Sequence, residues 1–382
     1  MPTLSRARRL PLSIALALAA TNVAAAAPAA NAVTAYAAQN LVSNGVAATP
    51  FTDSHLVNTW GVAFNPAGLV WVTNNRSGTS TLYDGTGAPN PLVVNVPPAQ
   101  GSGLGSPTGI VFSGTSDFIV GNATASGPSR FIFSSEDGVI AGWAPNVDLH
   151  NALRVVATPG ANYKGLAIAM SSTGARLYAT DFQGGRVDMF DTAFAKLATA
   201  GAFVDPKLPK DLYPFGIQTI GNQVYVTYAK HGGGLTGGGN GAASPGKDGG
   251  NGGAQGGGNA DSVVDIFDAD GKYLRRAIAQ TTLKQPWGLA LAPNGFGPAA
   301  GRLLVGDFHD GTIGTYDAGT GAFLGLLKDP KGDELRIPGL WGFQFGNGVN
   351  SQPTNTLFFA AAPNGQGGGI YGSVSVVTGK AK

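Results

Sequence analysis

The chain has 382 residues, of which 12% are charged and 60 are glycine. An average soluble domain carries about 25% charged residues and about 7% glycine. The net charge of +2 excludes the strongly basic surface typical of nucleic-acid-binding proteins. The absence of cysteine excludes disulfides, a thiolate nucleophile and cysteine-ligated zinc. We therefore expect a glycine-punctuated globular protein that has no nucleic-acid partner.

The first 27 residues have the pattern of a secretory signal peptide. Arg6, Arg8 and Arg9 precede an apolar run over 10–20, and small residues follow at 24–27. The run is short and rich in alanine, whereas a membrane-spanning helix needs about 20 strongly apolar residues. We expect cleavage near Ala26 or Ala27 and export of the chain to the periplasm or the extracellular space, with no membrane span after cleavage.

A short signature recurs six times along the rest of the chain: one variable residue, then glycine, then an apolar strand. The intervals between these glycines are 48, 56, 51, 72 and 54 residues. A period of about 50 is typical of one blade of a β-propeller. The six glycines are Gly61, Gly109, Gly165, Gly216, Gly288 and Gly342.

Each unit continues with short apolar runs separated by Gly, Asp and Asn, a pattern typical of antiparallel strands. A small sheet cannot bury both of its faces alone, but six sheets packed around an axis can. We predict one all-β domain over 28–382, a six-bladed β-propeller, with residues 36–43 adding a strand that closes the last blade. The expected blades are approximately 58–105, 106–160, 161–210, 211–284, 285–337 and 338–378.

The longest interval between the glycines contains a segment, 231–260, in which 15 of 30 residues are glycine. Such a segment buries too little apolar surface to offset its ordering entropy. We predict a flexible loop inserted into the fourth blade.

The chain resembles six-bladed propellers of the NHL and TolB types. The stretches that carry this resemblance include Thr81-Leu82-Tyr83-Asp84-Gly85 and Gly339-Leu340-Trp341-Gly342. More specifically, it resembles an uncharacterised family of exported bacterial propellers, some of which end in a PEP-CTERM sorting tail. That tail is missing here, and the resemblance implies no known activity.

Lactonases of the gluconolactonase or senescence-marker type also resemble this fold. The resemblance implies a metal on the propeller axis, held by Asn and Asp residues at the position before each repeat glycine. In this chain that position reads Trp, Thr, Lys, Phe, Trp and Trp. We therefore expect no metal there.

The residues before the six glycines form the first candidate site, at one mouth of the central channel. Aromatic faces together with one cation can stack on a sugar or another planar ligand, although the same side chains could equally pack between blades. These residues are Trp60, Thr108, Lys164, Phe215, Trp287 and Trp341.

Polar residues that end the second strand of each blade form a second candidate ring. Carboxylate and amide oxygens on one axis could bind hydroxyl groups or a divalent cation such as calcium, which takes six to eight oxygens. They could equally stabilise turns. His309, two residues after Asp307, is the best single candidate for proton transfer. The ring reads Asn74, Asn122 (or Ser134), Asp181, Tyr228, Asp307 and Ala361.

Three functions stay open at this point. The first is a binding or scaffold module that engages a small molecule, glycan or protein at the aromatic mouth. The second is a hydrolase or lactonase that uses Asp181 and Asp307 with a metal, and the third is a structural role in the cell envelope. We expect a monomer with no required cofactor.

Overall fold

The structure is a computed structural model that describes residue 1 and residues 32–198, 200–231, 262–280 and 283–380. All but the first residue of the predicted signal peptide, and all but the first residue of the predicted 231–260 loop, lie outside the described residues. Within the described ranges the chain forms 26 strands and one short 3-10 turn, η1 (Gly297–Ala299). No helix in these ranges has the length and apolar character needed to cross a bilayer.

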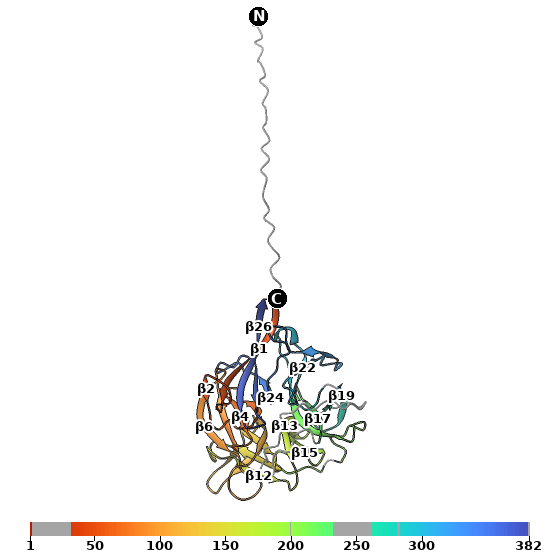
Figure 1. Cartoon of the computed structure of the whole chain (residues 1–382). Coiled ribbons are helices and arrows are strands. Elements are labelled where there is room, and N and C mark those ends of the chain that lie inside the picture. Colours follow the sequence, from red (N-terminus) through yellow and green to blue (C-terminus); the bar gives the residue numbers. More distant parts are fainter. Residues whose placement is uncertain (2–31, 199, 232–261, 281–282, 381–382) are drawn as a thin grey trace.

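Six antiparallel sheets follow one another around a central axis, which confirms the predicted six-bladed β-propeller (Figure 1). One edge strand of each sheet faces the axis and contacts the inner strand of the next blade. The last inner strand contacts the first, so the ring is closed. The inner strands are β3 (Thr59–Phe64), β7 (Pro107–Phe112), β13 (Tyr163–Ser171), β16 (Leu212–Ile220), β20 (Pro286–Leu291) and β24 (Leu340–Phe345).

Blades one, four and five each continue outward with three further strands. In blade one these are β4 (Val70–Asn74), β5 (Thr79–Tyr83) and β6 (Pro89–Asn95). In blade four they are β17 (Gln223–Lys230), β18 (Ser262–Phe267) and β19 (Tyr273–Gln280). In blade five they are β21 (Leu303–Asp307), β22 (Ile313–Tyr316) and β23 (Phe323–Leu326).

Blades two and three depart from this pattern. A small hairpin lies between the first and second strands of blade two, and the sheet of blade three has only three strands. The hairpin is formed by β8 (Ile119–Gly121) and β9 (Ser126–Pro128). The other outer strands are β10 (Phe131–Ser135), β11 (Val139–Trp143) and β12 (Leu153–Ala157) in blade two, and β14 (Gly174–Asp181) and β15 (Arg186–Phe190) in blade three.

The N-terminal strand completes blade six, as predicted, although it starts earlier than residue 36. β1 (Ala32–Ser43) pairs antiparallel with β26 (Ile370–Lys380), which follows β25 (Leu357–Ala361), and the short β2 (Phe51–Thr52) pairs with the end of β1. Because the two ends of the chain share one sheet, opening the ring would require the β1–β26 pairing to break.

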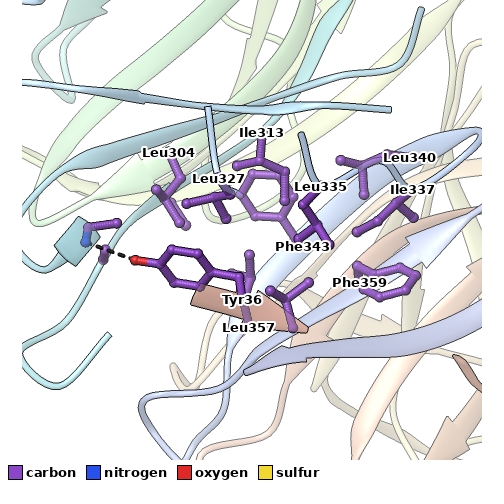
Figure 2. Close-up of a cluster of buried hydrophobic side chains, with 14 of the residues drawn as sticks. Tyr36, Leu304, Ile313, Leu327, Leu335, Ile337, Leu340, Phe343, Leu357 and Phe359 are labelled. Carbon is purple, nitrogen blue, oxygen red and sulfur yellow. Dashed lines mark hydrogen bonds between the residues drawn. The ribbon is translucent and has the colours of Figure 1, made fainter. Parts of the chain in front are cut away.

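Tyr36 fixes β1 against blade five (Figure 2). Its ring is buried in an apolar cluster with Leu304, Leu327 and Leu357. Its hydroxyl donates to the carbonyl of Phe296 at 3.0 Å and accepts from the N–H of Ala299 at 2.9 Å. The closing strand is therefore held by side-chain contacts with the neighbouring blade as well as by its own sheet.

The core lies mainly between neighbouring blades. Trp71 of blade one stacks on Phe131 of blade two, with ring centroids 4.1 Å apart, and also contacts Trp143. Each sheet therefore buries its faces against the sheets on either side, as the repeat predicts.

The repeat glycine lies in a β-bulge in every blade. In β3, Thr59 pairs with Asn74 and Val62 pairs with Val72, so two residues, Trp60 and Gly61, lie opposite one. The ladders of the other five inner strands shift at the same point. A bulge bends the strand and redirects the neighbouring side chain, which explains why the variable residue turns toward the mouth.

The glycines are needed because the inner strands approach one another closely. A Cβ atom on Gly61 would lie 2.6 Å from the carbonyl oxygen of Thr108 in the next blade. A Cβ atom on Gly342 would lie 2.6 Å from the carbonyl oxygen of Trp60, across the closure between blades six and one. Any side chain at these positions would push neighbouring blades apart.

Candidate functional site

An aromatic plug closes the channel at the end where the inner strands begin. We use this name for Trp60, Phe215, Trp287 and Trp341 of the predicted ring together with Phe182 and Phe308, which follow the second strands of their blades. The rings of Trp60 and Trp341 stack at 3.6 Å, and Phe308 stacks on Trp341 at 4.0 Å. Trp287 lies perpendicular to both tryptophans.

Most of the plug is inaccessible to a ligand in this structure. Trp60, Phe215 and Trp341 are buried, whereas Trp287 and Phe308 are only partly buried. On the axis below them is a cavity of about 20 Å³, room for about one water molecule. The predicted aromatic mouth is therefore a sealed end whose inner rings pack on one another.

Lys164, the one cation of the predicted ring, is only 2% exposed and forms an ion pair with Glu136, which is 4% exposed. Its Nζ atom also lies 5.2 Å from the ring centre of Trp60. The ammonium group is therefore neutralised inside the plug and does not face solvent.

A chain of hydrogen bonds links this ion pair back to Trp60. Glu136 Oε2 accepts from Asn75 Nδ2 at 3.0 Å, and Asn75 Oδ1 accepts from Asn58 Nδ2 at 2.9 Å. Asn58 Oδ1 in turn accepts from the indole N–H of Trp60 at 3.0 Å. All of these residues are buried, and a fully satisfied buried network favours one arrangement of the groups that it joins.

A second hydrogen bond that orients the aromatic plug crosses the channel. The indole N–H of Trp287, in blade five, donates to the carbonyl of Lys164, in blade three, at 3.0 Å. The position of the Trp287 ring is therefore set by the backbone on the far side of the axis.

Thr108, the polar member of the ring, has a structural role shared with three other threonines. Its hydroxyl donates to the carbonyl of Tyr163 in the next blade at 2.8 Å. Thr73, Thr180 and Thr227 lie opposite the bulges and likewise donate to carbonyls of the next inner strand. Sequence reasoning missed these hydrogen bonds between blades, although a Thr directly precedes the candidate ring residue in three blades, before Asn74, Asp181 and Tyr228.

The two carboxylates of the second ring accept hydrogen bonds from loops of their own blades. Asp181 Oδ1 accepts from two backbone N–H groups, and Oδ2 lies 2.8 Å from Arg186. Asp307 accepts from the N–H groups of Lys284, Gln285 and His309 at 2.8–3.0 Å. Burial raises the pKa of Asp307, and the backbone donors oppose that rise.

No cluster of three or more His, Asp or Glu side chains suited to a metal occurs in the part of the chain that the structure describes. The carboxylates of Asp181 and Asp307 therefore act as turn-stabilising acceptors. A calcium ion at this ring stays a prediction.

Asn122 lies outside the second ring. It follows β8 in an exposed loop, where its Oδ1 atom accepts from the N–H groups of Thr124 and Ala125. The equivalent position in blade two is Ser135, which pairs with Pro107, one residue after the alternative Ser134. The β8–β9 hairpin has the composition of a blade strand, which is why the sequence alone misplaced this residue.

The remaining ring members are buried and do not converge on a ligand. Asn74 Nδ2 donates to Thr79 and Thr81 in the next strand of its own blade. Tyr228 lies in the core between blades three and four, and Ala361 packs in the core of blade six.

Tyr228 lies near a buried acidic pair. Arg276 bridges Asp205 and Asp265, with 3.2 Å between its Nε atom and Asp265. Desolvation and the adjacent Asp205 carboxylate raise the pKa of Asp265 to about 7, while Arg276 opposes the rise. The cluster joins the loop of blade three to blade four.

His309 and His231 occupy different environments at this end of the channel. His309 is exposed, and its backbone N–H donates to Asp307. The His231 ring stacks on Phe182 at 4.4 Å and meets Tyr213 edge-on at 3.7 Å, and its Nε2 atom lies 2.8 Å from the Phe182 carbonyl. Because a carbonyl only accepts, Nε2 carries a proton and holds the ring in place.

Sequence reasoning missed His231 because it treated this residue as part of the glycine-rich loop. The accessible aromatic surface at this mouth is formed by Tyr213, Trp287 and Phe308, which are partly buried, and by the exposed His231. We call these four residues the aromatic rim.

Comparison with known protein sequences finds uncharacterised viral relatives. An uncharacterised protein of Acanthamoeba polyphaga mimivirus is 29% identical over 354 residues, covering 90% of this chain and 81% of the relative. A second uncharacterised protein of that virus is 28% identical over 343 residues, covering 87% and 84% of the two chains. No family model matches the chain.

Among solved structures, virginiamycin B lyase from Staphylococcus aureus aligns with a TM-score of 0.50 and 12% identity, covering 90% of this chain and all of the lyase. A Bacteroides thetaiotaomicron protein of unknown function aligns with a TM-score of 0.52 and 10% identity, covering 91% and 76% of the two chains. At such identities the likeness shows the propeller fold alone. Membership of the exported bacterial family stays a prediction.

Proposed function

We propose that this protein is an exported binding module whose ligand or partner docks on the aromatic rim. The observation that supports this most directly is the collection of Tyr213, Trp287, Phe308 and His231 over the sealed end of the channel. Rings held in fixed orientations offer flat apolar surface at low entropic cost, which suits a sugar ring or an aromatic side chain of a partner.

The packing beneath the rim gives it rigidity. The ring of Phe308 stacks on Trp341, and the ring of Trp341 stacks on Trp60. The orientation of Trp60 is set by the buried hydrogen-bond chain from Lys164. A preorganised surface of this kind loses little conformational entropy on binding.

The hydrolase alternative is less well supported. It needs Asp181 and Asp307 to hold a metal, yet their oxygens accept backbone N–H groups or pair with Arg186. Releasing them would leave backbone donors without partners, among them the buried N–H group of Gln285, for which the loss of its acceptor costs about 1–3 kcal/mol.

Export is part of the proposal and rests on the signal-peptide pattern at residues 1–27. Removing these residues leaves β1 intact, because that strand begins at Ala32. N-terminal sequencing of the protein recovered outside the cytoplasm should give a first residue near Pro28. An intact Met1 on that material would contradict it.

Binding is tested with glycan and peptide arrays probed with the purified mature protein. We expect a ligand whose signal falls at least tenfold in Phe308→Ala and in Tyr213→Ala. Phe323→Ala is the matched control, because Phe323 is 43% exposed on the outer strand β23, far from the channel mouth. Equal loss in the control, or binding unaffected by both rim variants, would contradict docking on the rim.

A further inference from the structure

The opposite end of the channel contains a cavity of about 300 Å³ that neither candidate ring reaches. Its walls come from the later residues of the inner strands, and the aromatic plug closes the axis beyond its floor. It is therefore a pocket with one entrance, and its volume lies at the lower end of the range for small-molecule sites. The residues used below are Phe64, Phe112, Gln218 and Gln344, all of which line it.

The pocket wall is rich in backbone hydrogen-bonding groups. Each inner strand is the edge strand of its sheet and pairs on one side only. Alternate N–H and C=O groups on the free edge of such a strand have no partner within the sheet. Inner strands of five blades line the pocket, so their free edges offer both donors and acceptors to its contents.

Two side-chain amides add to this lining. Gln218 in blade four and Gln344 in blade six both line the pocket and are only partly buried. Neither amide forms a hydrogen bond within the part of the chain that the structure describes. Each can offer two donors and one acceptor to a ligand.

The pocket is uncharged, because none of its lining residues is Asp, Glu, Lys, Arg or His. An ion would lose hydration there without a compensating charge, which disfavours ionic ligands. Phe112, from blade two, is partly buried and supplies aromatic surface, whereas Phe64, from blade one, lines the pocket but packs mainly in the core.

We infer that this pocket binds an uncharged polyhydroxy compound of the size of one sugar ring or cyclitol. Hydroxyl groups both donate and accept, as the free strand edges and the two glutamine amides do. The C–H face of such a ring can pack on Phe112. A purely apolar ligand would leave the backbone groups unsatisfied, and a long extended chain would exceed the closed pocket.

Saturation-transfer difference NMR tests this inference on the mature protein, with glucose, N-acetylglucosamine and myo-inositol as probes. We expect saturable binding of at least one probe. Gln344→Trp, which fills the pocket, should weaken that binding at least tenfold. The absence of saturable binding by all three probes, or unchanged binding in Gln344→Trp, would overturn the inference.

Three further variants separate this site from the rim and from misfolding. The double variant Gln218→Leu, Gln344→Leu keeps the side-chain size but removes both amides, and it should also lose binding while keeping the wild-type circular dichroism spectrum. Phe323→Ala, on the outer strand β23 and outside both the rim and the pocket, should leave binding unchanged. Loss of binding in the rim variant Phe308→Ala, with binding kept in the double glutamine variant, would place the sugar on the rim and overturn the pocket.

Discussion

Replacing Gly342 with alanine tests the idea that close contact between inner strands closes the ring. The added Cβ would lie 2.6 Å from the carbonyl oxygen of Trp60 and 2.8 Å from the Trp287 ring. The first distance is about 0.8 Å shorter than the 3.4 Å at which ordinary van der Waals contact begins. Neither neighbour can move freely, because Trp60 belongs to blade one and Trp287 is bonded across the channel.

Overpacking of this kind costs about 1–3 kcal/mol, and displacement of the Trp287 bond adds about 1 kcal/mol. We therefore expect the free energy of unfolding to fall by about 3 kcal/mol, which for about 350 residues lowers Tm by about 4 °C. Urea denaturation followed by tryptophan fluorescence measures the change.

Two control variants make this result interpretable. At Gly165 the nearest atom to an added Cβ is the methyl group of Ile217 at 3.1 Å, so Gly165→Ala should lose less stability. Gly319 is on an exposed turn with its nearest atom at 3.5 Å, so Gly319→Ala should lose none. Equal stability of the Gly342 and Gly319 variants would refute the close-contact explanation of the repeat.

Three further changes test other parts of the structure. Lys164→Met leaves the Glu136 carboxylate buried without its cation, so the free energy of unfolding measured by urea denaturation should fall by about 3–5 kcal/mol. Adding Glu136→Gln to this variant should recover part of that loss. No recovery would show that the two side chains are not coupled. The pKa of Asp265 is raised to about 7, so the folded chain binds this proton more tightly than the unfolded chain. The contribution of Asp265 to stability should therefore be greatest below about pH 4 and should be lost, by about 4 kcal/mol, as the pH rises from about 4 to about 7. Asp265→Asn should remove that part of the pH dependence, and an unchanged slope would contradict the assignment. Tyr36→Phe removes two hydrogen bonds to the η1 turn, so the free energy of unfolding should fall by about 1–3 kcal/mol. Amide hydrogen exchange in β1 should become faster. Unchanged exchange would show that the hydroxyl does not hold the strand.

The number and order of the blades could be predicted from the sequence because the bulge imposes a local requirement in every blade. A glycine such as Gly61 or Gly342 is needed where one inner strand meets the next. The glycine therefore recurs once in each blade, and its spacing is visible in the sequence. The closing strand was also predictable, since the last repeat lacked an outer strand and residues 36–43 had the pattern to supply it.

The burial and the contacts of the candidate-site residues could not be predicted from the sequence in the same way. The pattern placed Trp60 and Trp341 at one mouth, but whether such rings face a ligand or each other depends on bond directions at the bulge. The pairing of Lys164 with Glu136 joins two blades across 28 residues, and neither residue alone indicates it. Asn122 was misplaced because the inserted hairpin imitates a blade strand.

The most direct test of the sealed propeller is an electron-density map of the mature protein at a resolution that places side chains on the axis. The structure predicts Phe308, Trp341 and Trp60 stacked in that order, Trp287 bonded across the channel to the carbonyl of Lys164, and β1 paired with β26. A channel open at both ends, with these rings turned toward solvent, would contradict it.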